Sequence, residues 1–329
     1  MKKLVGIVLC VMLLSGAMVS SLMAQEPLLG EGMTIYIQMG GFEGGPATLP
    51  RTTGAREAAR HLGVRLIEQY SQWQPEVMVR HLQEAIAAMP DGIVIMGHPG
   101  SDAFAPFVEE AFDLGIIVTS GNTPLDALQD MYQDRGFGYA GVELYIGGYI
   151  TGQAMVRAGL EPGDKALVYG LFAQAGRGES PRGMAEALEQ AGVIVDRVEI
   201  SPEVDADSSL CIPILTAYLE ANPDTKAIGT QHGAVTAQFM NVLKGLGKAP
   251  GEIIAGGIDL APAVIEALQE GYVTATLDQQ LYLQGFLPIL QIVLSKNYQI
   301  SGLSVNTGAG VVTPETIDAL IPLIEAGIR

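Results

Sequence analysis

Short apolar runs alternate with longer amphipathic stretches along almost the whole chain after residue 30. The runs have the length and composition of buried strands, whereas the stretches between them repeat apolar residues at three- and four-residue spacing, as helices do. Strands that alternate with helices in this way form parallel sheets with helices on both faces. The expected strands are Met33–Met39, Val64–Gln69, Gly92–Met96, Ile116–Thr119, Lys165–Leu171, Val193–Ile200, Ala227–Thr230, Ile253–Gly257 and Val273–Leu277.

Glycine and proline punctuate this pattern where helices are expected to end and begin. Gly63, Gly115, Gly192 and Gly271 each follow a helical stretch, at the place of a left-handed C-cap. Pro262 opens a helix that runs to Gln269, where its missing N–H costs little. The other expected helices include Glu76–Met89, Asp102–Leu114, Gly183–Gln190 and Ala234–Leu246.

The first residues resemble an export signal. Lys2 and Lys3 precede an apolar stretch from Leu4 to Met23, and Ala24 is followed by polar residues. This pattern is typical of a secretory signal peptide, residues 1–24. A membrane anchor is the alternative, although small residues interrupt the stretch. Removal of residues 1–24 leaves 305 residues, which suits two domains of ordinary size.

Charge and cysteine content exclude several classes of protein. The chain has 18 basic and 36 acidic residues, so its net charge is -18, or -20 without Lys2 and Lys3. Such a surface repels phosphate backbones, and no nucleic acid partner is expected. Cys211 would be the only cysteine of the mature chain, which allows neither an internal disulfide nor a thiolate metal site. We interpret it as a small buried apolar residue.

Motifs of catalysis are missing from the sequence. There is no Gly-x-Ser-x-Gly elbow, no Walker A loop and no His-Glu-x-x-His, so we expect no enzyme, no cofactor and no metal. Asp205 and Asp207 in "VDADSS" have the spacing of calcium ligands, but no twelve-residue loop follows them. A solvated acidic loop is the favoured interpretation. In doubly wound sheets ligands bind at the carboxyl ends of the strands, so the informative residues should follow the strands directly.

Three segments carry a family resemblance. Residues 91–122, "DGIVIMGHPGSDAFAPFVEEAFDLGIIVTSGN", contain a buried strand, a turn with proline, a helix and a second strand. Residues 140–155 read "AGVELYIGGYITGQAM". In residues 256–286 an Asp ends a strand, a later strand carries "DQQ", and a helix opens with "QG". In order and spacing the mature chain resembles the ribose/galactose-type (type I) periplasmic sugar-binding proteins, the solute-binding components of ABC transporters.

The resemblance implies an α/β fold of two Rossmann-like lobes, with parallel sheets joined by a three-segment hinge. The N-terminal lobe would comprise residues 26–140 and 281–305. The C-terminal lobe would comprise residues 141–280 and 306–329. The chain would cross between the lobes near Phe137–Ala140, Gln279–Leu281 and Ser304–Thr307.

The resemblance also implies which residues contact the ligand. The polar candidates are His98, Asn122, Arg177 (or else Arg182), His232, Asp259 and Gln279. The family's ring-stacking aromatics are missing near Ala47, Thr48 and Ala206. The aromatic candidates are therefore Phe42, Trp73 and, after them, Phe172.

Each candidate also has a purely structural interpretation. Asp259 and His232 stand where they would cap helices, and Asn122 precedes a turn with Pro124. Gln279 would brace the hinge. Arg177 would pair with a surface acid, and Trp73, the only tryptophan, would belong to the core.

The function implied by the resemblance is extracytoplasmic capture of a small sugar or polyol in the cleft between the lobes, for delivery to an ABC permease. The missing aromatics favour a short polyol or a furanose over a hexopyranose. The alternative is a receptor whose closed form docks on a membrane sensor kinase, for a sugar or an autoinducer-type signal. We expect a monomer in the periplasm, or an extracellular, membrane-associated protein if the host lacks an outer membrane.

Overall fold

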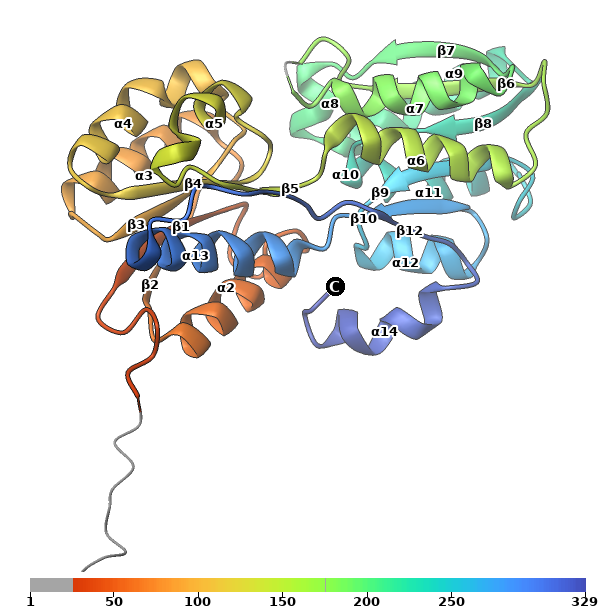
Figure 1. Ribbon diagram of the computed structural model, residues 1–329. Helices are drawn as coiled ribbons and strands as arrows, with labels where there is room; N and C mark the ends of the chain where they lie inside the picture. Colours follow the sequence, from red (N-terminus) through yellow and green to blue (C-terminus); the bar gives the residue numbers. More distant parts are fainter. Residues whose placement is uncertain (1–25, 175) are drawn as a thin grey trace, which may run out of the picture.

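The computed structural model describes residues 26–174 and 176–329, which form two α/β lobes that lie side by side (Figure 1). The expected signal peptide, residues 1–24, lies outside the described residues. Within them, each lobe is built on one six-stranded sheet. No helix of this part of the chain is long and apolar enough to cross a bilayer.

The first lobe has the strand order β11-β5-β4-β3-β1-β2, and every neighbouring pair is parallel. Its strands are β1 (Thr34–Gly40), β2 (Arg65–Tyr70), β3 (Gly92–Met96), β4 (Ile117–Asn122), β5 (Tyr139–Gly141) and β11 (Ser304–Asn306). Its helices are α2 (Leu49–Leu62), α3 (Pro75–Ala87), α4 (Ser101–Asp113), α5 (Asp126–Tyr132) and α13 (Leu281–Tyr298), with a 3₁₀ turn at Gln133–Arg135.

Side chains that alternate along the first sheet bury both of its faces. Ile93 and Ile95 pack against α3, α4 and α5, whereas Ile35 and Val94 pack against α2 and α13. Because successive residues of a strand point to opposite faces, continuous apolar runs such as β3 require helices on both sides. The sequence pattern therefore accounts for the layered architecture.

The second lobe has the strand order β12-β10-β9-β8-β6-β7. Its strands are β6 (Lys165–Gly170), β7 (Ile194–Glu199), β8 (Thr225–Gly229), β9 (Ile254–Ile258), β10 (Ala275–Asp278) and β12 (Gly310–Val312). Its helices are α6 (Leu144–Arg157), α7 (Glu179–Gln190), α8 (Pro202–Ala206), α9 (Cys211–Ala221), α10 (Gly233–Thr236), α11 (Phe239–Gly245), α12 (Pro262–Gln269) and α14 (Ile317–Glu325), with a 3₁₀ turn at Ser208–Leu210. Cys211 is fully buried in the apolar core.

The second sheet departs from the expected all-parallel form at one edge. Strand β12 pairs antiparallel with β10, because the chain re-enters the lobe from the hinge side after β11. The expected helix Ala234–Leu246 is also interrupted, since α10 ends at Thr236 and α11 begins at Phe239. The remaining architecture is the expected α/β fold with parallel sheets.

The chain passes between the lobes three times, at residues 142–143, 279–280 and 307–309 (Figure 1). The expected crossings at Phe137–Ala140 and Ser304–Thr307 begin too early. Phe137 is fully buried in the first lobe, and β5 pairs with β11 in the first sheet through Gly141 and Asn306. These backbone pairs extend the first sheet one residue beyond each expected lobe boundary.

Candidate ligand-binding site

A cavity of about 800 Å³ lies between the two lobes, at the ends of their strands. Eight of the candidates selected from the sequence line it, whereas Phe172 and Arg182 do not, and further residues also contribute to its wall. The eight are Phe42, Trp73, His98, Asn122, Arg177, His232, Asp259 and Gln279. The others include the polar residues Thr48, Thr123, Asp205, Gln231, Asp278 and Arg329.

Trp73 supplies a large aromatic surface to the first-lobe wall. It follows β2 in a left-handed backbone conformation, with φ of 60°, and Gln72 before it is also left-handed. The indole packs directly on the backbone of Gly40 and Gly41, where any side chain would collide with the ring. Trp73 is 37% exposed and lines the cavity. The structural interpretation, which assigned Trp73 to the core, was therefore wrong.

His98 lies beside Trp73, with 5.1 Å between the ring centroids. Burial, together with the Arg177 and Arg51 cations, lowers the pKa of His98 to about 3. The imidazole is therefore neutral at physiological pH, and no described residue forms a hydrogen bond with its buried Nδ1. Phe42, which is 58% exposed, stands at the cavity in the loop after β1.

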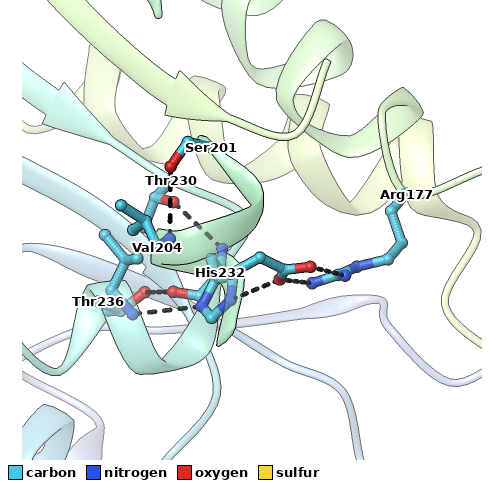
Figure 2. A network of polar contacts seen from close by, with 8 residues as sticks. Arg177, Ser201, Val204, Thr230, His232 and Thr236 are labelled. Carbon is cyan, nitrogen blue, oxygen red and sulfur yellow. Dashed lines mark hydrogen bonds and ion pairs between the residues drawn. The ribbon is translucent and has the colours of Figure 1, made fainter. Parts of the chain in front are cut away.

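The second-lobe wall carries an ion-pair network in which Arg177 and His232, both labelled in Figure 2, share the Asp205 carboxylate. Both terminal nitrogens of Arg177 donate to the Asp205 carboxylate, at 3.2 Å each, and His232 Nε2 lies 3.0 Å from its Oδ1. The hydrogen bond with His232 and the Arg177 cation hold the pKa of Asp205 at about 2. The carboxylate thus remains ionised and fixes the positions of both partners.

His232 uses both ring nitrogens within this network. Its Nδ1 accepts a hydrogen bond from the Val235 backbone N–H at 3.4 Å, which makes His232 the N-cap of α10. Nδ1 as the acceptor leaves the proton on Nε2, which donates to Asp205. The structural interpretation of His232 as a cap is therefore confirmed, and its side chain also lines the cavity.

Asp205 is the residue that the sequence analysis misjudged. It lies in the short helix α8 rather than in a solvated loop, and its side chain is 27% exposed. Arg177 pairs with it and not with a surface acid, whereas Arg182 pairs with Glu179 and is not part of the cavity wall. No sequence spacing indicated this contact, because Asp205 lies 28 residues from Arg177 and 27 from His232.

Asn122 and Asp259 occupy matching positions in the two lobes. Asn122 ends β4 and Asp259 follows β9, and each of these strands is third from the hinge edge of its sheet. Both residues have left-handed backbone conformations, with φ of 67° and 74°. Asn and Asp adopt this conformation more readily than other residues that carry a side chain. Asp259 does not cap α12, whose N-cap is Ala261.

Gln279, in the second crossing segment, bridges these two residues. Its Nε2 donates to Asp259 Oδ1 at 2.6 Å, and its Oε1 lies 3.4 Å from Asn122 Nδ2. Asn122 Nδ2 also donates to Gln284 Oε1 at 3.0 Å. Both amide protons of Asn122 are thus used, whereas its Oδ1 and the Oδ2 of Asp259 accept no hydrogen bond from a described side chain or backbone group.

Burial raises the pKa of the Asp259 carboxyl above its ordinary value, although Gln279 and the Arg51 cation oppose the effect. Two cations line the cavity, and each faces a carboxylate. Arg177 pairs with Asp205, and Arg329 pairs with Asp278 at 2.8 Å. Within the described residues, no group of His, Cys, Asp and Glu side chains is arranged to hold a metal ion.

Two α/β lobes with a polar cavity between them and three crossing segments define a class of two-lobed binding proteins. Residues 51–294 match the family model described as a periplasmic binding protein domain. The chain belongs to this family.

Individual relatives agree with this assignment. The chain is 30% identical over 255 residues to the xylose/arabinose-binding protein XylF of Sulfolobus acidocaldarius, a match that covers 73% of this chain and 61% of that protein. The chain thus spans about three fifths of the length of this curated relative.

Two solved structures share the fold. One is an ABC transporter periplasmic solute-binding protein from Actinobacillus succinogenes with bound D-allose, with a TM-score of 0.77, 21% identity and coverage of 87% of this chain and 99% of that one. The other is an ABC transporter solute-binding protein from Burkholderia graminis in complex with D-arabinose, with a TM-score of 0.76, 20% identity and coverage of 87% and 96%. These relatives are described as binding proteins and not as enzymes.

Proposed function

We propose that the protein captures a small, neutral sugar or polyol between its lobes and delivers it to an ABC importer in the membrane. The observation that carries the proposal is the cavity, because both lobes line it with polar atoms that have no hydrogen-bond partner among the described residues. A sugar hydroxyl is both donor and acceptor, and it can satisfy such atoms in pairs.

Particular atoms of the cavity suit particular parts of such a ligand. Asn122 Oδ1 and Asp259 Oδ2 are left to accept hydrogen bonds from hydroxyl groups. A hydrogen bond to a charged group contributes about 1.5–3 kcal/mol, so Asp259 should dominate the affinity. Trp73 presents an apolar surface that fits the C–H face of a ring. The family resemblance leads us to expect a ring-stacking aromatic near Ala47 and Thr48, where none is present. In this proposal Trp73, which follows β2, takes its place.

The charges of the cavity favour a neutral ligand. Arg177 and Arg329 already face carboxylates, and Asp259 is a half-buried carboxyl group that has no ion pair within the described residues. An acidic sugar or a sugar phosphate would place a negative charge near Asp259, whereas both guanidinium groups among the described residues of the cavity wall already have carboxylate partners. We therefore infer that sugar acids and sugar phosphates are excluded.

Capture would proceed by closure of the lobes. A ligand that contacts Asn122 and Asp259 together stabilises the closed arrangement over open ones, and the crossing segments are the hinge. In this proposal the eight residues selected from the sequence form the site, and a monomeric, extracytoplasmic protein docks on a permease after closure. No observation favours docking on a sensor kinase, and two of the solved relatives are described as parts of ABC transporters.

A ligand screen tests the proposal. The mature protein would be titrated calorimetrically and by thermal shift with D-xylose, L-arabinose, D-arabinose, D-ribose, D-allose, xylitol and myo-inositol. At a hundredfold excess over Kd, a ligand raises the free energy of unfolding by about 2.7 kcal/mol. Xylonate and ribose 5-phosphate are the charged controls and should give no shift. A protein that binds none of the neutral compounds, or that binds the charged ones equally well, would contradict the proposal.

A further inference from the structure

Gln284 lies at the N-terminal end of α13, between the cavity and the hinge, and its side chain is fully buried. Its carboxamide makes four hydrogen bonds. Oε1 accepts from Arg51 Nη2 at 3.2 Å and from Asn122 Nδ2 at 3.0 Å. Nε2 donates to the Gln279 carbonyl at 3.2 Å and to Thr307 Oγ1 at 3.1 Å. A carboxamide in which every donor and acceptor position is used has only one orientation.

The position of Gln284 is fixed from the opposite side by α2. The backbones of α2 and α13 touch, because Gly54 faces Tyr282 and Gly285 faces Arg51 with no room for a side chain at either glycine. Arg51 is itself fully buried, and it donates to the Met39 carbonyl at 2.7 Å as well as to Gln284. Loss of either hydrogen bond would leave part of this buried cation without a partner, which is strongly unfavourable. Arg51 therefore fixes the position of the Gln284 side chain.

Gln284 connects Asn122 to all three crossing segments. It bonds directly to Gln279 in the second crossing and to Thr307 in the third. The link to the first crossing runs through Asn122, whose carbonyl lies 3.0 Å from the Tyr139 hydroxyl, which lies 2.9 Å from the Val142 carbonyl. The carboxamide therefore stands where the first-lobe wall of the cavity meets the hinge.

We propose that Gln284 is a positioning residue for ligand binding, which turns the Asn122 side chain so that its Oδ1 faces the cavity. The inference rests on the proposed function. An acceptor at Gln284 Oε1 attracts Asn122 Nδ2 and so leaves Oδ1 for a ligand hydroxyl. Without that acceptor the Asn122 carboxamide can flip, so that either Oδ1 or Nδ2 faces the cavity. In this proposal Gln284 itself does not contact the ligand.

The test compares Gln284→Met with Gln291→Met in the mature protein. Gln291 is the matched control, since it lies on the same helix, is also buried, and bonds to the Tyr139 carbonyl and the Leu303 N–H away from the cavity. The probe is the compound of the neutral sugar and polyol panel that binds the wild type most tightly. Gln284→Met is expected to raise its Kd at least tenfold, and Gln291→Met less than twofold, although both substitutions lower the melting temperature.

A double-substitution cycle separates positioning from a general structural effect. If Gln284 acts through Asn122, the double variant that combines Asn122→Ala and Gln284→Met should have a Kd less than threefold higher than that of Asn122→Ala alone. If Gln284→Met fails to fold, Gln284→Leu takes its place in the comparison and in the cycle. Leucine also removes the acceptor for Asn122 Nδ2, so a Kd at least tenfold higher is again expected.

The outcomes distinguish the inference from the function on which it rests. The inference is wrong if the wild type binds a sugar and the Gln284 variants lose no more affinity than Gln291→Met. It is also wrong if the affinity losses of Gln284→Met and Asn122→Ala are additive in the double variant. In either case Gln284 has only a structural role. A wild type that binds no compound of the panel refutes the proposed function and this inference together.

Discussion

Replacement of Asp205 by Asn tests the network on the second-lobe wall most directly. The substitution keeps the shape of the side chain and removes the charge that Arg177 and His232 share. The pKa of the Asp205 carboxyl is about 2 in the folded protein and ordinarily 3.8. Since each pKa unit corresponds to about 1.4 kcal/mol, the network contributes roughly 2 kcal/mol to the free energy of unfolding at neutral pH.

The pH dependence of this contribution has a definite sign. A carboxyl whose pKa is lowered by folding stabilises the protein above its unfolded pKa, and the effect is lost as pH falls through the folded pKa. The difference between wild type and Asp205→Asn should therefore be constant from pH 7 to about pH 4, and roughly half of it should remain near pH 3. At neutral pH the melting temperature should fall by about 4–8 °C.

Urea denaturation at several pH values measures this difference, and calorimetric titration with the sugar that binds the wild type measures affinity. We expect Kd to rise about tenfold, because Arg177 loses the partner that holds it at the cavity. Asp207→Asn is the control, since Asp207 lies two residues away, its side chain bonds to Ser209, and it is not among the described residues of the cavity wall. A stability difference that does not change between pH 7 and pH 3 would refute the reasoning.

Three further predictions concern the cavity. Asp259→Asn should raise Kd at least a hundredfold in calorimetric titration, and unchanged affinity would remove Asp259 from the site. Thermal unfolding of this variant should show equal or higher stability, because burial disfavours the charged form of the Asp259 carboxyl. Trp73→Ala should raise Kd about tenfold or more, and Phe42→Ala, at an exposed residue, less; the reverse order would assign the stacking surface to Phe42. His98→Gln should leave the pH dependence of Kd between pH 8 and pH 6 unchanged, because the pKa of His98 is about 3, and affinity should weaken in acid as Asp259 is protonated at a pH above its ordinary 3.8; a step in Kd near pH 6.5 that His98→Gln removes would contradict this account of His98.

Hydrophobic periodicity predicted the longer strands of both sheets. Strand β3 was predicted residue by residue, since a buried run bounded by polar residues has few alternative registers. The glycines at 63, 115, 192 and 271 all have the left-handed conformation expected after a helix. Strands β5, β11 and β12 were not predicted, because three residues are too few to show a period, and their pairing depends on the hinge.

The residues around the cavity were predictable to the extent that they directly follow strands. Asn122 and Asp259 could be selected because parallel strands end at one edge of their sheet. Asp205 could not, because it reaches the cavity through the turn of α8 and its partners stand 28 and 27 residues away in sequence. The orientation of Trp73 also depends on a local backbone feature, the left-handed pair Gln72–Trp73, that no periodicity indicates.

The two lobes share a strand order but present different chemistry to the cavity. The first lobe offers an indole and a neutral imidazole, and the second offers the carboxylate of Asp259 and the network around Asp205. A sugar has an apolar C–H face and a hydroxyl edge, so in the proposed function each wall suits one side of it. A ligand that satisfies only one wall gains nothing from closure, whereas one that satisfies both favours the closed form by the sum of the two contacts. Selectivity would then arise from the requirement that one small molecule reach both Trp73 and Asp259.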